Sequence, residues 1–318
     1  MIGDDEMITI QTEVSRSARL RGVLAVFQTP FGEDEAVDHA ALTGELRWII
    51  DQGADGLVLG MVSEVLRLSD AERRQVVRTA AEVAGAEDVP LIVSVGAEST
   101  SVALRRVDEA VELGAAAVMA TPPLTSLIED EQLAGYFGTL LRHSAVPVIV
   151  QDASSYVGGP LSIEIQARLH SEFDSQVLFK PESVPIVPTL GALLEATGGR
   201  AVVFEGMGGG ALLESFPAGI AGSMPGAEVV WAVVALWKAL RAGDGARAVR
   251  IDEPLREMLR LQRDLDSFIA CEKFLLAHQG VLPNRVARGP SSYVLQADVM
   301  ELLRNLFDRL VEACRIGT

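Results

Sequence analysis

Residues 53–84, GADGLVLGMVSEVLRLSDAERRQVVRTAAEVA, contain one complete strand–helix unit. The apolar run Gly56–Leu59 is short and bounded by glycines, which predicts a buried strand. Apolar residues then recur at helical spacing over Asp70–Ala84, and Ser69 followed by Glu72 is typical of a capping box at a helix start. The stretch therefore predicts a strand, a loop and an amphipathic helix, in that order.

The same unit recurs along the chain. Seven further apolar runs predict strands at Val23–Phe27, Leu91–Val95, Ala116–Ala120, Val146–Gln151, Val177–Lys180, Ala201–Glu205 and Ile220–Met224. Helical patterns lie between or after them at Asp38–Gln52, Ser101–Leu113, Glu129–Ser144, Ser162–Ser171, Gly209–Ala218 and Glu228–Ala242. Eight such units predict an α/β fold, a parallel (β/α)8 TIM barrel. A doubly wound open sheet is the alternative, but the first strand leads into Gln28–Gly32, which lacks the glycine-rich GxGxxG loop.

We divide the chain into a polar N-terminal segment (1–20), the barrel (21–242) and a C-terminal helical extension (243–318). The extension contains helical patterns at Ala246–Asp264, Ser267–Gln279 and Ala297–Cys314. Residues 1–20 lack the basic and apolar regions of a secretory signal, and no apolar run approaches the roughly 20 residues of a membrane span. We therefore expect a cytoplasmic protein.

Composition excludes several classes of function. The 318 residues are 49% hydrophobic and carry a net charge of −17, so the chain has ample material for a core and no basic surface for nucleic acid. Four histidines are scattered, and Cys271 and Cys314 lie in helical patterns without metal-ligand spacing. We expect no metal site, no nucleic-acid or membrane partner, and buried free thiols.

Lys180 is the most suggestive single residue. It ends the apolar run Val177–Phe179, and barrel enzymes carry their active sites at the C-terminal ends of the strands. Burial at that position would favour a neutral amine, which is the form that attacks a keto carbon. The alternative is a rim lysine paired with Glu182 in solvent. The other two lysines, Lys238 and Lys273, lie in charged helical patterns and are expected to be solvated.

Two other strand ends carry groups that could contact a ligand. Ser63 offers a hydroxyl and backbone N–H groups for a carboxylate, or alternatively caps the following turn. The glycine-rich run Gly206–Gly210 lacks the Lys-Ser/Thr of a Walker A loop. Close backbone approach to a ligand is therefore favoured for this run, with phosphate binding as the alternative.

Several of these segments together have a family likeness. They are GVLAVFQTPF (22–31), GADGL (53–57), GMVSE (60–64), LSDAER (68–73) and LFKPES (178–183). In combination they resemble the motifs of the dihydrodipicolinate synthase / N-acetylneuraminate lyase superfamily of class I aldolases. The segments MATPP (119–123), VQDA (150–153) and GIAGSM (219–224) are similar to its branch of 2-keto-3-deoxy sugar-acid dehydratases, which includes L-2-keto-3-deoxyarabonate dehydratase.

The resemblance implies a lyase, either aldolase or dehydratase, in which Lys180 forms a covalent imine with pyruvate or a 2-keto-3-deoxy sugar acid. It implies no separate cofactor and a homotetramer. The residues that would bind the substrate are Val62, Ser63, Gln151, Gly206 and Ser223.

The chain departs from the family pattern at two places. Leu124 stands where the family has a tyrosine that shuttles protons, and Val62 replaces a threonine that helps to hold the substrate carboxylate. Tyr156 and Glu182 are the candidate replacements for the shuttle, with rim packing and structural hydrogen bonding as their respective alternatives. The missing tyrosine leaves an alternative function open, in which the chain binds keto acids with little or no turnover. The arginine that serves the second substrate of dihydrodipicolinate synthases has no counterpart in 151–158, which argues against that reaction.

Overall fold

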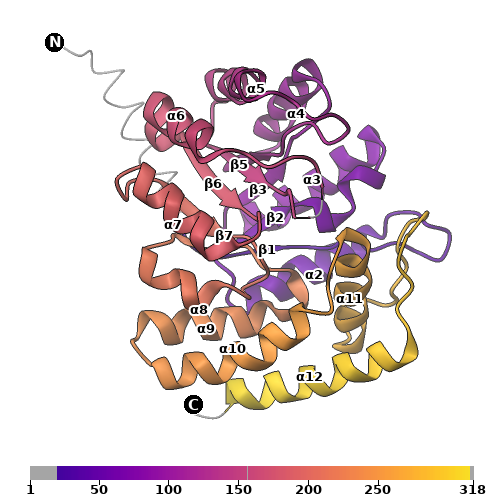
Figure 1. Cartoon of the computed structure of the whole chain (residues 1–318). Coiled ribbons are helices and arrows are strands. Elements are labelled where there is room, and N and C mark those ends of the chain that lie inside the picture. The colour runs from indigo at the N-terminus through magenta and orange to yellow at the C-terminus, as the bar shows by residue number, and fades with distance from the viewer. Residues whose placement is uncertain (1–19, 156, 316–318) are drawn as a thin grey trace.

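The structure, a computed structural model, describes residues 20–155 and 157–315; the predicted segment 1–20, apart from Leu20, and Tyr156 therefore lie outside the described residues. Eight parallel strands form a closed barrel in sequence order, with β8 paired to β1 (Figure 1). The strands are β1 Gly22–Val26, β2 Gly56–Leu59, β3 Leu91–Ser94, β4 Ala117–Ala120, β5 Val148–Asp152, β6 Val177–Pro181, β7 Val202–Glu205 and β8 Gly222–Ser223. The predicted TIM barrel is confirmed, and the open sheet is excluded.

Helices alternate with the strands around the barrel. They are α2 His39–Asp51, α3 Asp70–Ala86, α4 Thr100–Glu112, α5 Asp130–His143, α6 Ile163–Phe173, α7 Ile186–Ala196, α8 Leu212–Ser215 and α9 Val230–Arg241. The capping box at the start of α3 is present, since Ser69 accepts from the Glu72 backbone and Glu72 accepts from Ser69. The helix expected over Gly209–Ala218 is shorter than expected, because Gly208 and Gly209 take positive φ angles of 67° and 92° that a helix cannot contain.

Side-chain alternation along the strands decides which residues enter the barrel. Ile149 and Leu178 belong to the apolar layer inside the barrel, separate from the layer between strands and helices. Residues two positions apart on a strand point to the same face, so Gln151 and Lys180 also point inward, one step nearer the C-terminal mouth. The two are register partners on β5 and β6. The fold therefore brings an amide and an amine together at the top of the core.

Three helices follow the barrel: α10 Gly245–Leu259, α11 Leu265–His278 and α12 Ala297–Arg315. They gather on one side of the barrel in Figure 1, where α10 packs on α9 and α12. Helix α11 contacts the short 3-10 turns Met61–Ser63, after β2, and Ala227–Val229, after β8. The extension thus touches loops at the mouth of the barrel. No helix among the described residues is long and apolar enough to cross a membrane.

Candidate active site

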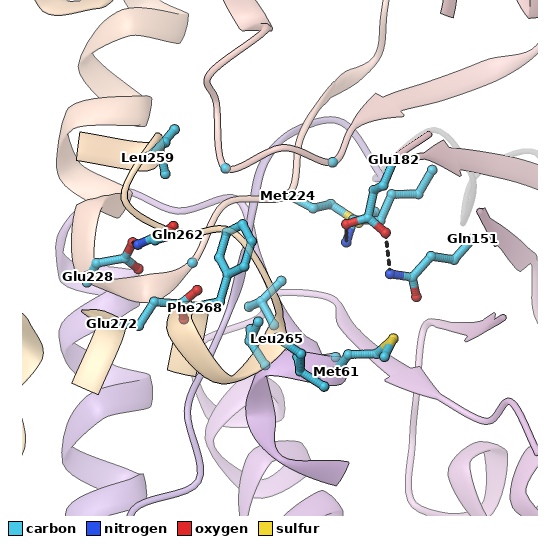
Figure 2. A pocket seen from close by; sticks show the side chains of 17 residues that line it. Met61, Gln151, Glu182, Met224, Glu228, Leu259, Gln262, Leu265, Phe268 and Glu272 are labelled. Carbon is cyan, nitrogen blue, oxygen red and sulfur yellow. Dashed lines mark hydrogen bonds and ion pairs between the residues drawn. The ribbon is translucent and has the colours of Figure 1, made fainter. Parts of the chain in front are cut away.

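A pocket opens to solvent at the C-terminal ends of the strands. This is the end of the barrel at which such enzymes carry their active sites. The strand ends and the loops after them contribute Val26, Gly60, Met61, Val62, Gln151, Lys180, Glu182, Gly206, Gly208, Met224, Gly226 and Glu228. The C-terminal extension completes the wall with Leu259, Gln262, Leu265, Phe268 and Glu272 (Figure 2). We call this cavity the mouth pocket.

Lys180 and Glu182 form a buried pair in the mouth pocket. Their exposed fractions are 4% and 1%, and the Lys180 Nζ donates to Glu182 Oε1 at 2.9 Å. Gln151 Nε2 donates to the other carboxylate oxygen of Glu182 at 2.5 Å, drawn as the dashed line in Figure 2. Lys180 is therefore not a solvated rim lysine, and Glu182 is fixed between an amine and an amide.

Gly206, at the end of β7, makes room for this pair. A Cβ at this position would lie 2.4 Å from Glu182 Cγ and 3.1 Å from Lys180 Cε. Both distances are shorter than the roughly 3.5–4.0 Å at which carbon atoms pack. The Lys180–Glu182 pair thus fills the space that a side chain at position 206 would take, and the approach of this backbone to a ligand stays a prediction.

The other two lysines differ from each other. Lys238 is exposed, as expected. The expectation that Lys273 is solvated is wrong, because its side chain is 1% exposed and forms an ion pair with Glu64. Its Nζ also donates to the carbonyl groups of Thr29 at 2.8 Å and Val286 at 2.7 Å, and burial lowers its pKa. Lys273 does not line the mouth pocket, so it joins α11 to the loops of the barrel and is not a second nucleophile there.

Two predicted substrate-binding hydroxyls lie outside the pocket wall. The Ser63 hydroxyl donates to the Phe27 carbonyl at 2.5 Å and accepts from the Gly60 N–H at 3.0 Å, which is the turn-fixing alternative. The Ser223 hydroxyl donates to Glu205 Oε2 at 2.6 Å. Because both serines are fully buried and bonded within the protein, the structure does not bring their hydroxyls to the ligand space. Val62, by contrast, lines the pocket.

Glu205 also accounts for the glycine-rich loop. Backbone N–H groups of Met207, Gly209 and Ala211 donate to its carboxyl group at 2.9, 2.9 and 3.3 Å. Burial raises the pKa of Glu205, and these hydrogen bonds oppose the rise. An internal carboxyl group therefore occupies the centre of the loop, which is the place that a phosphate would need. The phosphate-loop alternative finds no support.

Three polar residues of the pocket were missed by the sequence reasoning: Glu228, Gln262 and Glu272. Burial raises the pKa of Glu228 to about 7, and burial together with the charge of Glu228 raises that of Glu272 well above its usual range. A signal for them does exist in the sequence. Each of the two glutamates is the single acidic residue in a strongly apolar run, AEVVWAVVAL (227–236) and FIACEKFLL (268–276). Burying an unpaired charge in such a run costs free energy, so an acidic residue there is a candidate functional group.

A closed barrel with a lysine–carboxylate pair buried in its C-terminal mouth defines a TIM-barrel enzyme. The chain belongs to the dihydrodipicolinate synthetase family, whose sequence profile matches residues 19–306. This confirms the resemblance found from the motifs, and family membership makes the protein a lyase.

Known relatives cover nearly the whole chain. An L-2-keto-3-deoxyarabonate dehydratase from Azospirillum brasilense is 30% identical over 305 residues, covering 92% of this chain and 96% of the relative. A 4-hydroxy-tetrahydrodipicolinate synthase from Chelativorans sp. is 27% identical over 275 residues, with 85% and 92% covered. The solved structure of the 4-hydroxy-tetrahydrodipicolinate synthase from Methylacidiphilum fumariolicum SolV superposes with a TM-score of 0.83 at 23% identity, covering 92% of this chain and 97% of that one, which supports the fold.

Proposed function

We propose that the protein is a Schiff-base-forming lyase that acts through Lys180 on pyruvate or a 2-keto-3-deoxy sugar acid. The observation that carries the proposal is the buried contact of 2.9 Å between the Lys180 Nζ and Glu182 Oε1 inside the mouth pocket. Of the lysines among the described residues, Lys180 is the one that lines this pocket. No cofactor other than the covalent imine is required by this chemistry.

The pair supports a defined sequence of steps. Glu182 accepts a proton from Lys180, whose amine then attacks the keto carbon; Glu182 passes that proton to the oxygen of the carbinolamine, which leaves as water. The protonated imine then accepts the electron pair released when a C–H or C–C bond at the neighbouring carbon breaks. Glu182, next to the nitrogen, is the group that we assign to carry protons to and from these atoms.

The remaining predicted residues take more limited parts. We assign Val62, Gln151 and Gly206, which line the wall near Lys180, to contacts with the keto acid. Ser63 and Ser223 would act indirectly, by holding the loops after β2 and β7.

Leu124 stands at the position of the tyrosine that shuttles protons in the family, and a leucine side chain has no proton to transfer. Leu124 lies in a separate cavity, where its N–H donates to Glu98 Oε1 at 2.8 Å. Glu182 is therefore our first choice for the proton carrier, and Tyr156 remains the second. A Tyr156→Phe variant with unchanged turnover would remove the second choice.

Borohydride reduction in the presence of pyruvate tests the proposal. A reduced adduct mapped to Lys180 by mass spectrometry supports it, and Lys180→Arg abolishes the adduct because a guanidinium is not a nucleophile at neutral pH. Lys238→Arg is the matched control and keeps the adduct, since that lysine is exposed and outside the pocket. A folded protein that yields no Lys180 adduct with any 2-keto acid contradicts the proposal.

Turnover separates a lyase from a protein that only binds keto acids, because binding alone also permits trapping. Release of product from a 2-keto-3-deoxy sugar acid under steady-state conditions decides between them. We further expect a cytoplasmic homotetramer, and sedimentation of the purified protein measures the assembly.

A further inference from the structure

The side of the mouth pocket away from Glu182 and Gln151 is lined by three buried polar side chains. Figure 2 shows Glu228, Gln262 and Glu272 grouped there, with Phe268 between them and the Glu182 side. All three line the pocket, yet their exposed fractions are only 1%, 6% and 2%. We call these three residues the far wall. Nothing in the Schiff-base steps described above uses them.

The two carboxyl groups of the far wall converge on one point. A Cβ built on Gly226 would lie 2.3 Å from Glu228 Oε2 and 2.8 Å from Glu272 Oε1. No ion pair with a lysine or arginine is present for either carboxyl among the described residues. Two buried carboxylates so placed cannot both ionise easily, and the favoured arrangement is a pair that holds one proton.

The far wall also has hydrogen-bonding capacity that the protein leaves unused. Gln262 Nε2 donates to Glu228 Oε1 at 3.3 Å, and Gln28 Nε2 donates to Glu272 Oε2 at 2.5 Å. The shared proton engages Glu228 Oε2, so Gln262 Oε1 is the far-wall acceptor that is buried without a partner within the part of the chain that the structure describes. Buried polar atoms are normally paired, so this acceptor indicates a ligand that brings a donor. The unpartnered amide oxygen of Gln262 is an observation independent of the acidic pair.

The chemistry of the ligand follows from this set. The far wall offers hydrogen-bond acceptors next to a proton shared by two carboxyl groups. Hydroxyl groups fit such a wall, because each hydroxyl both donates and accepts a hydrogen bond. A carboxylate on the ligand would meet like charge and a surplus of acceptors. Leu265 and Phe268, on the same side, offer apolar contact to the carbon chain between hydroxyls.

We propose that Glu228, Gln262 and Glu272 form a binding site for the hydroxyl-bearing tail of the keto acid, opposite the lysine that holds its keto end. The inference rests on the proposed function of Lys180 and adds the selectivity: substrates with a hydroxylated tail are favoured over those with a bare or a carboxylated one.

Borohydride trapping on Lys180 with keto acids of one chain length tests the inference. The probes are 4,5-dihydroxy-2-ketopentanoate, 2-ketopentanoate and 2-ketopentanedioate, with pyruvate as a reference that has no tail. In the native protein we expect the dihydroxy acid to half-saturate trapping at a concentration about tenfold or more below that of the unsubstituted acid, since one good hydrogen bond is worth about a factor of ten.

Variants locate the preference on the far wall. Glu228→Met and Glu272→Met keep the side-chain volume but remove the polar atoms, and each should lower the preference about tenfold. Glu272→Gln should retain most of it, because an amide also donates and accepts. Gln166→Met is the matched control: Gln166 is 1% exposed, bonds to backbone carbonyl groups at the start of α6 and does not line the pocket, so the preference should stay within about twofold.

Equal half-saturation by the dihydroxy and unsubstituted acids in the native protein overturns the inference without any variant. So does a preference for the dicarboxylate, or a hydroxyl preference that survives in both methionine variants. If none of the four keto acids forms an adduct on Lys180, the proposed function fails and the inference fails with it. Trapping without a hydroxyl preference overturns the inference alone.

Discussion

Gly206→Ala is the most exacting test of the site geometry. The new methyl group would lie 2.4 Å from Glu182 Cγ and 3.0 Å from its Cδ, and Glu182 is 1% exposed. Since carbon atoms pack at about 3.5–4.0 Å, the carboxyl group must move by roughly 1 Å or more away from the Lys180 nitrogen. A misplacement of this size costs about 100-fold in a reaction that depends on alignment. Crowding at a buried position also destabilises by about 1–3 kcal/mol.

The assay is the initial rate of borohydride-trapped adduct on Lys180 with saturating pyruvate, measured beside thermal unfolding. Gly191→Ala, in α7, is the matched control because its Cβ meets nothing within 4 Å. We expect the control to trap at the native rate and Gly206→Ala to trap about 100-fold more slowly while still folded. A native rate in Gly206→Ala would refute the account of why a glycine is needed beside the pair.

Three further predictions follow from the charged groups. Glu182→Gln keeps the shape but removes the proton carrier, so kcat should fall by about 100-fold or more, and steady-state kinetics with an unchanged kcat would contradict the assignment. Lys273→Met leaves Glu64 buried with a weaker partner, Arg67 at 3.4 Å. The free energy of unfolding, measured in urea, should therefore fall by about 3 kcal/mol. A change as small as that caused by the control substitution of the exposed lysine, Lys238→Met, would count against a structural ion pair. Burial raises the pKa of Glu45 to about 8, so between pH 4.5 and 8 the folded protein holds a proton that the unfolded chain has released. The free energy of unfolding therefore falls as pH rises through this window, by up to about 1.4 kcal/mol per pH unit for this group, and Glu45→Gln should make the slope shallower; equal slopes would exclude the effect.

The apolar patterns of the strands predict most of the fold and the Lys180 side of the mouth pocket. The short apolar runs locate the strands, and a strand's alternation then decides which residues face inward, as with Gln151 and Lys180. Local sequence also marks Gly206 as a point of close approach. These conclusions depend on neighbours in the same strand or the next one, and such neighbours can be read from a sequence.

The errors arise where a side chain's partner lies far away in sequence. Ser223 stands at a strand end, but its hydroxyl reaches Glu205 on β7. Lys273 has a charged neighbour in its helix, but its ion pair is with Glu64, after β2. The carboxyl group of Glu272 meets that of Glu228 only because α11 packs against the turn after β8. Tertiary packing creates these side-chain contacts, and no local sequence pattern predicts them.

The origin of the far wall has a consequence for how relatives are compared. The nucleophile comes from β6, whereas Gln262 and Glu272 come from the C-terminal extension, which contains none of the motif segments of the barrel although the family profile reaches residue 306. On the proposal that the far wall selects the substrate, reaction type and substrate choice depend on different stretches of the chain. We therefore expect family members with the same lysine strand but different residues at these positions to prefer different substrates. Exchanging the segment 259–272 between such proteins would be expected to move the substrate preference and leave the chemistry in place.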